Sequence, residues 1–331
     1  MTTREEVARR AGVSVAAVSY VLNNKSGVSD ATRQKVLDAI RELDYKPSYA
    51  ARTLKTKKTD HLTVFVNYLG DPFEAGILNH IEEEARTFGY FVNFQTYRPE
   101  QEEQLSHFFP GRIDGVFLLG QSLRPETLEA LHKINIPVVS IMKPVEAGPI
   151  TAYVDIDWTG SMRKLIRHLK RAGHRRIGFM ANFSPAHAHE ARRLAFIRAM
   201  EAESLPCDPD DFLSGRGRLE HAKQTTADYL KNGRSDRYTA FVAASDLMAI
   251  GMLTACREAG VAVPGHLAIA GCENILMTLQ TTPTVTTLHY PRPEAAVSAV
   301  RTMVESLRGE PAESKLLEAE LLVRGSTSPE A

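Results

Sequence analysis

Two short helices joined by a tight turn are predicted over the first 23 residues, and this pair constrains the N-terminal part of the fold most strongly. The apolar residues of the first helix repeat at helical spacing, at Val7, Ala8 and Ala11. Thr3 and Glu6 have the spacing of a capping box, in which each side chain satisfies a free backbone N–H group. Gly12 supplies the turn. This arrangement is typical of a helix-turn-helix.

Ser14 is placed to cap the second helix, because its side-chain oxygen can accept from the free N–H groups at the helix start. The residues expected to face inward are Ala17, Val18, Val21 and Leu22. The residues expected to face outward are Val15, Ala16, Ser19 and Tyr20. In a helix-turn-helix, the N-terminal half of the second helix enters the major groove, where all four base pairs can be distinguished. The outward side chains are therefore predicted to face DNA.

A third helix is predicted from Asp30, after a cap at Ser29, to about Leu43. Its apolar residues at helical spacing are Val36, Leu37 and Ile40. Pro47 ends this small bundle. The segment that follows, residues 48–54, is too short to be a stable isolated helix, because helices below about 12 residues are marginal in water. We therefore expect a conditional helix there.

Several motifs in the chain resemble the lactose/galactose repressor family. Those of the N-terminal part are the A-G-V-S-x-x-x-V-S-x-V-L-N run, V-S-x-x-T-R from Val28 to Arg33, L-x-Y-x-P from Leu43 to Pro47, and A-A-R-x-L over residues 50–54. Further matches lie at residues 173–178, 246–251, 267–271 and 283–287. The resemblance implies a transcriptional repressor that binds a pseudo-palindromic double-stranded DNA operator as a homodimer or higher oligomer. It also implies allosteric control by a small-molecule effector, with the direction of control left open.

Beyond residue 60, β-branched apolar runs alternate with amphipathic helices, the pattern of a parallel sheet covered on both faces. Strands are expected at residues 62–68, 91–96, 115–119, 138–141, 177–181, 239–243 and 267–270. Helices are expected at residues 74–88, 102–109, 126–134, 161–171, 191–203, 219–231 and 247–259. A last helix, 293–308, and a strand, 316–323, have too few partners for another domain and are expected to complete the two sheets.

The predicted fold class is an N-terminal all-α helix-turn-helix head followed by an α/β core of two doubly wound parallel-sheet subdomains. The resemblance implies that this core is like a periplasmic binding protein, with a ligand cleft between two lobes. The expected ranges are 1–46 for the head, 47–60 for the hinge and linker, and 61–331 for the core. Within the core, the N-lobe takes about residues 61–157 and 290–318, and the C-lobe about 158–289 and 319–331. Open α/β sheets bind ligands beyond the carboxyl ends of their strands, which favours the same cleft.

The net charge of zero hides an asymmetry along the 331 residues. Residues 1–60 hold 12 Lys and Arg against 7 Asp and Glu, a surplus of +5, and the remainder carries −5. The basic end is the part that would meet phosphate. Because no apolar stretch approaches the roughly 20 residues that span a bilayer, and the N-terminus is polar, we expect a cytoplasmic, nucleoid-associated protein without a membrane partner.

The three cysteines, Cys207, Cys256 and Cys272, are far apart and lack C-x-x-C spacing, so neither a disulfide framework nor a zinc site is indicated. The pair His187 and His189 is better explained as polar loop residues than as a metal site, since no third ligand lies nearby. No cofactor is expected.

The resemblance assigns base contacts to Val15 and Ala16, which can pack on a thymine methyl group but cannot donate or accept hydrogen bonds. Tyr20 stands where relatives more often have Arg, and it is left open whether this residue contacts a base or a phosphate. The predicted phosphate contacts are Thr3, Ser14, Ser19, Asn23, Ser29 and Thr32. Plain helix capping is the alternative role for these residues, and both roles are compatible at Ser14 and Ser29.

In the hinge, the resemblance places Leu54 as a minor-groove wedge with Ala51 packed beside it, opening a base step and bending the duplex. The alternative is a linker leucine buried against its own core. If two hinge helices fold only when held together on DNA, a ligand that rotates the N-lobes apart removes the ordered hinge.

For the effector, the resemblance places eight residues in the cleft: Asn67, Phe73, Met142, His189, Arg192, Asp246, Glu273 and Tyr290. Arg192 matches an arginine that grips ligand hydroxyls or a carboxylate, with a surface salt bridge as the alternative. Met142 and Glu273 stand where relatives commonly have Asp, and Gly217 where many have a stacking aromatic. These departures leave open whether the effector is a carbohydrate or another metabolite. Trp158, at the crossover between lobes, is expected to be structural.

Two other classes of protein are alternatives to a transcriptional repressor. An α/β enzyme with an N-terminal appendage is disfavoured, because the chain lacks a G-x-S-x-G elbow, a Walker loop and a G-x-G-x-x-G after a strand. A secreted sugar-binding protein matches residues 61–331, but the absence of a signal sequence and the helix-turn-helix argue against it.

Overall fold

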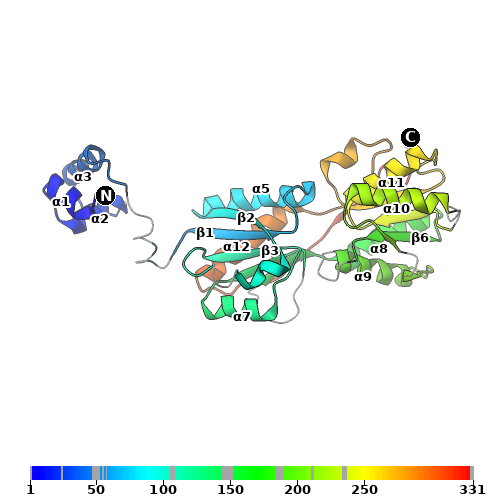
Figure 1. Cartoon of the computed structure of the whole chain (residues 1–331), viewed down its shortest axis with the longest axis horizontal. Coiled ribbons are helices and arrows are strands. Elements are labelled where there is room, and N and C mark those ends of the chain that lie inside the picture. The colour runs from blue at the N-terminus through cyan, green and yellow to red at the C-terminus, as the bar shows by residue number, and fades with distance from the viewer. Residues whose placement is uncertain are drawn as a thin grey trace. The chain divides into compact units, whose positions relative to one another are not determined.

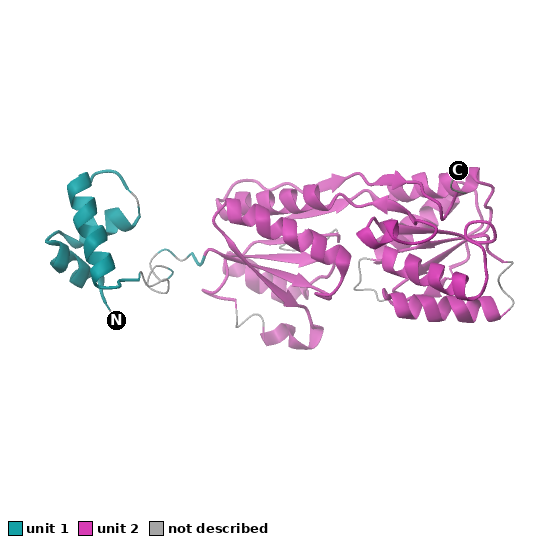
Figure 2. Cartoon of the chain, turned by 90° about the horizontal axis from the view of Figure 1, so that it is seen from above, with its two compact units in different colours: residues 1–59 teal, residues 60–331 magenta. Residues whose placement is uncertain are grey.

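The structure is a computed structural model that describes residues 2–23, 25–46, 53, 56, 58–104, 109–143, 152–183, 189–209, 212–232 and 237–328. The chain forms two compact units, Met1–Thr59 and Asp60–Ala331, coloured separately in Figure 2. In the described part of the chain, no helix is both long and apolar enough to cross a membrane.

The N-terminal unit is a bundle of three helices, as predicted: α1 (Arg4–Ala11), α2 (Val15–Leu22) and α3 (Asp30–Glu42). Its buried core consists of Val7, Ala8, Val18, Val21, Val36, Ala39 and Tyr45. Gly12 takes a left-handed conformation, with φ of 65°, and its N–H group closes the end of α1, which explains the glycine at this turn. In α3, Val36 and Ala39 supply the buried face, while Leu37 is 40% exposed.

The first lobe of the large unit contains a six-stranded sheet in the order β11-β5-β4-β3-β1-β2, with all neighbouring strands parallel. Its strands are β1 (His61–Val66), β2 (Phe91–Thr96), β3 (Gly115–Leu119), β4 (Val138–Ile141), β5 (Ala152–Ile156) and β11 (Lys315–Leu317). Its α-helices are α5 (Pro72–Thr87), α7 (Pro125–Lys133) and α12 (Arg292–Leu307). A short 3-10 helix, η1, spans Pro99–Gln101. The helix predicted over residues 102–109 lies partly outside the described residues.

Helices cover both faces of this sheet (Figure 1). Along β1, Val64 and Val66 join the core beneath α5 and α12, whereas Phe65 joins a separate core with α7. Successive strand residues point to opposite faces, so a strand buried on both sides must be apolar throughout. This explains the continuous apolar run of β3, all of whose residues are buried.

The second lobe contains a six-stranded sheet in the order β12-β10-β9-β8-β6-β7. Its strands are β6 (Ile177–Ala181), β7 (Leu213–Ser214), β8 (Ala240–Ala243), β9 (Ala268–Glu273), β10 (Thr286–His289) and β12 (Glu320–Leu322). Its helices are α8 (Trp158–Arg171), α9 (His189–Ala202), α10 (Leu219–Lys231), α11 (Asp246–Glu258) and the 3-10 helix η3 (Leu276–Leu279). Neighbouring strands are parallel except β10 and β12, which are antiparallel.

The end of the chain differs from the prediction in one respect. One strand was expected over residues 316–323, but the structure has two three-residue strands, β11 in the first sheet and β12 in the second. Residues between them cross from one lobe to the other, and that crossing interrupts the strand. The chain also passes between the lobes at residues 156–158 and 289–292. Three strands were missing from the expectation, β5, β7 and β10.

Candidate functional site

The second helix of the N-terminal unit has one exposed face. Val15 and Tyr20 are 40% and 44% exposed, Ala16 is also exposed, and Ser19 is half-buried. The residues predicted to face outward therefore lie on the open side of α2. Tyr20 rests near the following turn, where a Cβ built on Gly27 would lie 3.7 Å from its ring.

Apart from Ser19, which lies within α2, the predicted phosphate-contacting residues lie at helix starts and ends, where they already make hydrogen bonds. Thr3 forms the capping box with Glu6, whose carboxylate accepts from the Thr3 backbone N–H at 2.8 Å. The Ser14 hydroxyl accepts from the N–H of Ala17 at 3.2 Å. Ser29 accepts from the backbone N–H of Thr32 at 3.3 Å, and the two hydroxyls share a further hydrogen bond.

Asn23 follows α2 and folds back on that helix. Its side-chain amide donates to the Ser19 carbonyl at 2.7 Å. Ala51 and Leu54, the predicted wedge residues of the hinge, lie outside the described residues. Their contacts with DNA therefore stay predictions.

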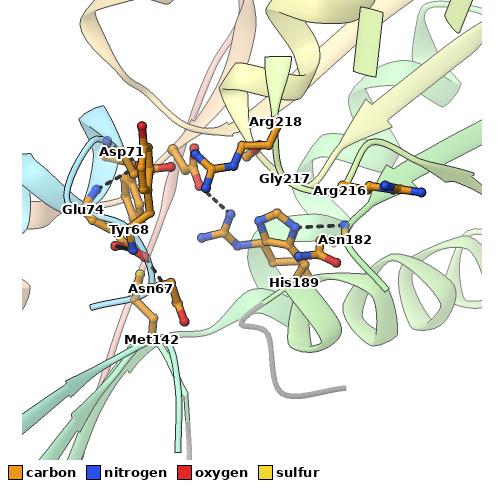
Figure 3. A pocket seen from close by; sticks show the side chains of 14 residues that line it. Asn67, Tyr68, Asp71, Glu74, Met142, Asn182, His189, Arg216, Gly217 and Arg218 are labelled. Atoms are coloured by element: carbon orange, nitrogen blue, oxygen red, sulfur yellow. Dashed lines mark hydrogen bonds and ion pairs between the residues drawn. The ribbon is translucent and has the colours of Figure 1, made fainter. Parts of the chain in front are cut away.

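The large unit contains a pocket of about 220 Å³ between its two lobes (Figure 3). The first lobe lines it with Asn67, Tyr68, Asp71, Phe73, Glu74 and Met142. The second lobe lines it with Asn182, His189, Arg192, Arg216, Gly217, Arg218, Ser245 and Glu273. These residues follow or end β1, β4, β6, β7, β8 and β9, or lie at the starts of helices, so the pocket lies at the carboxyl ends of parallel strands.

Arg192 lines this pocket and is only 1% exposed. Its Nη1 atom donates to Glu273 Oε1 at 2.7 Å and to the carbonyl of Ala244. Its guanidinium carbon lies 4.4 Å from the ring centroid of Trp158 and 5.7 Å from that of Phe73. The surface salt bridge considered as an alternative for Arg192 is therefore wrong, because both partners of this ion pair are buried.

Glu273 stands at the end of β9 and is also hydrogen-bonded to the start of α11. Its Oε2 atom accepts from the backbone N–H of Asp246 at 3.2 Å. Burial raises the pKa of the Glu273 carboxyl above its ordinary value, while the Arg192 guanidinium acts in the opposite direction. Arg192 therefore has a buried carboxyl partner without any ligand.

Two residues that the resemblance placed in the cleft lie behind the pocket wall. Asp246 is fully buried, and its carboxylate accepts from the Thr287 hydroxyl at 2.7 Å and from the Ile275 N–H at 2.9 Å. Tyr290 is fully buried with its ring 5.2 Å from that of Phe73. Both residues support groups that line the pocket, and neither lines it.

Trp158 has a comparable supporting position. It is 6% exposed, and its Nε1 atom donates to Asp155 Oδ1 at 3.2 Å. It does not line the pocket, but its ring lies against the Arg192 guanidinium. A tryptophan at this crossover between the lobes therefore packs against the buried arginine.

Glu74 is an acidic residue of the pocket that was absent from the sequence prediction. It lies in the first turn of α5, where its carboxylate accepts from the Asn67 side chain and the Tyr68 backbone, both at 3.3 Å. Burial, followed by the charge of Asp71, raises the pKa of Glu74 to about 7. Asp71 caps the same helix through the N–H groups of Phe73 and Glu74.

The other residues that sequence reasoning missed include a pair that joins the lobes, Tyr68 and Arg218. The Arg218 guanidinium carbon lies 3.9 Å from the Tyr68 ring centroid. In Figure 3, Arg218 reaches from the second lobe toward Tyr68 and Asp71. Further lining residues that were not predicted are Asn182, Arg216 and Ser245. A signal for Asp71 and Ser245 was available, because both are cap residues at the start of a helix.

Metal ligands do not gather in the described part of the chain: no group of three or more His, Cys, Asp or Glu residues there is placed to hold a metal ion. His189 lines the pocket, and its Nδ1 atom accepts from the backbone N–H of Asn182 at 3.1 Å. His187, the other member of the considered pair, lies outside the described residues.

Two protein-family models match the chain. Residues 3–48 match the bacterial regulatory proteins of the lacI family, and residues 166–327 match the periplasmic binding protein-like domain. Among relatives, the HTH-type transcriptional regulator DegA of Bacillus subtilis is 30% identical, over 99% of this chain and 98% of DegA. The HTH-type transcriptional repressor CytR of Escherichia coli is 30% identical, over 98% and 96%. The repressor PurR of Photobacterium profundum is 28% identical, over 98% of both chains.

Solved structures show the same architecture over nearly the whole chain. The complex of the transcriptional regulator CelR with cellobiose is 28% identical, with a TM-score of 0.73 over 98% of this chain and 100% of CelR. The lac repressor dimer bound to operator and the anti-inducer ONPF has a TM-score of 0.86 over 98% and 99%. That second match is 23% identical and shows the fold alone.

Proposed function

Because the chain belongs to the lacI family of bacterial regulatory proteins, and is a DNA-binding transcriptional repressor with a ligand-binding domain, we propose that it binds a pseudo-palindromic operator as a homodimer under effector control. The family and the prediction that the chain is not an enzyme are confirmed by full-length relatives that are regulators. The fold class is confirmed by the family models and the solved structures. This proposal rests on one observation: the chain contains both a helix-turn-helix and a pocket lined by two lobes.

The DNA-binding part of the proposal is supported by the surface of α2. Val15, Ala16 and Tyr20 are exposed together on a helix whose opposite face is fixed in the core. We infer that Val15 and Ala16 meet base edges, while Thr3, Ser14, Ser19, Asn23, Ser29 and Thr32 contact phosphates. Ala51 and Leu54 are proposed to act in the minor groove. The protein would then be cytoplasmic and associated with the nucleoid.

The effector part of the proposal is supported by the pocket between the lobes. Its lining residues come from both lobes, so a ligand that contacts both walls binds one lobe arrangement better than another. Arg192 lines this pocket, and its buried Nε atom has no hydrogen-bond partner in the described part of the chain. A coupling of about 1–3 kcal/mol between this pocket and the operator would change DNA affinity roughly 5- to 150-fold.

The dimer is supported by an exposed apolar surface on η3. Leu276, Met277 and Leu279 are 71%, 40% and 52% exposed, although large apolar side chains usually gain stability by burial. We propose that a second copy of the chain covers them, because a two-fold dimer brings two reading helices to the two halves of a palindrome. Replacing Leu276 and Leu279 by Glu should weaken the dimer, as sedimentation of the full-length protein would show. Phe88→Glu, at a 37% exposed residue elsewhere, is the control.

Selection of operators from random duplexes with the full-length protein tests the proposal as a whole. We expect a palindromic sequence whose binding is tighter than that of bulk DNA and weakens as salt rises. Binding would then be measured again with sugars, nucleosides and organic acids. A protein with no preference for any palindrome contradicts the DNA-binding proposal. A cleft ligand that leaves operator affinity unchanged contradicts the effector proposal.

A further inference from the structure

The ionisable groups of the pocket are separated by sign between its two walls. The first lobe contributes two carboxyl groups, Asp71 and Glu74, and no Arg or Lys among the lining residues. The second lobe contributes three arginines, Arg192, Arg216 and Arg218, and one carboxyl group. A ligand that fits both walls therefore meets hydrogen-bond acceptors on one side and cations on the other.

The three arginines differ in what they already bind. Arg192 is paired with Glu273 and bonded to a carbonyl, so much of its charge is compensated within the protein. The guanidinium groups of Arg216 and Arg218 make no hydrogen bond or ion pair with the residues that the structure describes, although Arg218 stacks on Tyr68. The positive charge that is available to a ligand is therefore that of Arg218 and Arg216.

A rigid turn places Arg218 at the pocket. The Gly215 N–H donates to the Ala181 carbonyl at the end of β6, and the Arg218 N–H donates back to the Gly215 carbonyl, both at 3.0 Å. A Cβ at Gly215 would lie 2.6 Å from the Met248 sulfur, so the turn packs closely on α11. Arg216 and Gly217 between them are both left-handed, with φ of 50° and 69°. Arg216 is exposed and directed away from Glu74 in Figure 3. Arg218 is therefore the arginine better placed to bind a ligand inside the pocket.

Gly217 leaves room beside this arginine. A Cβ at Gly217 would lie 3.6 Å from the His189 ring and 3.8 Å from Asn182, two other lining residues. A larger side chain would therefore project among these lining residues. Without one, that space is open to a polar group of a ligand next to Arg218.

We propose that the effector is an acid: a small polyhydroxylated molecule whose carboxylate or phosphate group binds Arg218, with Arg216 adding charge at the rim. Its hydroxyl groups donate to Asp71 and Glu74 on the opposite wall. Guanidinium groups bind both kinds of anion through paired N–H donors, and such charge-assisted hydrogen bonds are about twice as strong as neutral ones. This inference rests on the proposed function, because it takes the pocket to be the effector site.

The test compares matched neutral and acidic compounds on the full-length protein. The probes are D-glucose with D-glucuronate and D-glucose 6-phosphate, D-ribose with D-ribose 5-phosphate, and glycerol with D-glycerate and glycerol 3-phosphate. Thermal unfolding would identify binding, and calorimetry would measure affinity at low and high salt. We expect an acidic member to bind at least tenfold more tightly than its neutral counterpart and to weaken as salt rises. The carboxylate and phosphate members show which anion is preferred.

Arg218→Gln should reduce the affinity for the acidic probe by about 10- to 100-fold. The affinity for the neutral counterpart should fall by no more than about fivefold, the effect of losing the contact between Arg218 and Tyr68. Arg216→Gln should have a smaller effect. Arg198→Gln is the matched control, because Arg198 is an exposed arginine of α9 that does not line the pocket. An Arg218 variant with unchanged affinity for the acid overturns the inference. So does a neutral probe that binds as tightly as its acid, or a panel in which no acid binds.

Failure of this inference can be told from failure of the proposed function by measuring operator affinity with each bound probe. A neutral compound that binds the pocket and changes operator affinity leaves the proposed function intact and excludes the acidic effector. An acid that binds through Arg218 without changing operator affinity supports the ligand class and contradicts the proposed regulation.

Discussion

The guanidinium of Arg218, at the start of α10, lies 3.9 Å from the ring centroid of Tyr68, just beyond β1, and so joins the two lobes at the pocket. The Tyr68 ring also folds over its own turn, where a Cβ on Gly70 would lie 2.6 Å from ring atoms. Since Tyr68 is 45% exposed, the contact belongs to the weaker class of cation–π interactions, worth about 0.5–1 kcal/mol. It is strong enough to bias the lobes toward closure without fixing them.

Tyr68→Leu should therefore shift the lobes toward more open arrangements by about two- to fivefold in population. The measurement is the distance distribution between spin labels at Glu129 on α7 and Glu220 on α10, one in each lobe. Phe88→Leu is the control, because Phe88 is a partly exposed aromatic residue that does not line the pocket. Identical distributions for Tyr68→Leu and the unchanged protein would show that this contact does not hold the lobes together.

The buried pair of Arg192 and Glu273 gives a second prediction. Replacing Arg192 should cause a large loss of stability, in addition to any effect on ligand binding. Removing one member of a buried ion pair leaves an uncompensated charge and costs about 3–5 kcal/mol. Arg192→Met should show this cost in urea unfolding, and adding Glu273→Gln should recover part of it, so that the two effects do not add.

The matched control for this cycle is the pair Arg193 and Glu190 on the same helix. Their side chains are 2.6 Å apart but 25% and 36% exposed. Arg193→Met and Glu190→Gln should each cost no more than about 1 kcal/mol, because partly exposed ion pairs contribute little. Additive effects in the buried pair, or equal costs in both pairs, would contradict the prediction.

The sequence predicts those parts of the molecule that carry a local pattern, such as apolar residues at regular spacing or a cap residue at a helix start. The helices of the head have apolar residues at helical spacing, and Ser14 and Ser29 are cap residues in the positions where the structure has caps. Core strands such as β3 and β8 are apolar throughout, which identifies them without fixing their ends. In contrast, β7 has only two residues, and β11 and β12 are separated by a crossing between lobes, so no periodic pattern marks them.

The pocket shows a similar division. Arg192 could be identified because a resemblance supplied its position, while its burial and its pairing with Glu273 could not, since 81 residues separate them. Tyr68 and Arg218 lie in two connecting segments that come together only when the lobes do. Asp246 and Tyr290 were placed in the same region, but side-chain direction decides between lining a pocket and supporting its wall. That direction depends on packing that no local pattern contains.

Glu74 gives a prediction about pH. Burial and the charge of Asp71 raise its pKa from 4.5 to about 7. The unfolded chain therefore loses this proton near pH 4.5, while the folded protein keeps it until near pH 7. Because the folded state holds more protons in that window, the contribution of Glu74 to stability falls as the pH rises through it and then levels off.

Glu74→Gln has no such proton to lose. The loss of unfolding free energy between pH 5 and pH 7.5 should therefore be smaller in this variant, by at most about 3 kcal/mol. Urea unfolding of the full-length protein at the two pH values measures this difference. Glu313→Gln, at an exposed residue, is the control and should follow the unchanged protein. If Glu74→Gln loses as much unfolding free energy between the two pH values as the unchanged protein does, Glu74 titrates in its ordinary range.

The exposed face of α2 gives the last prediction. Val15 and Ala16 carry only apolar groups, so they can select bases by packing on thymine methyl groups but not by hydrogen bonds. Replacing them together by Thr and Gln adds a hydroxyl and an amide, and Gln can pair with adenine at two atoms. Selection from random duplexes should then return a different preferred sequence, with each changed base pair worth about 1–3 kcal/mol. Leu37→Gln on α3 is the control, because Leu37 is 40% exposed, as Val15 is, but lies off this helix. Recovery of the original sequence by the double variant would show that other residues of the head read the bases.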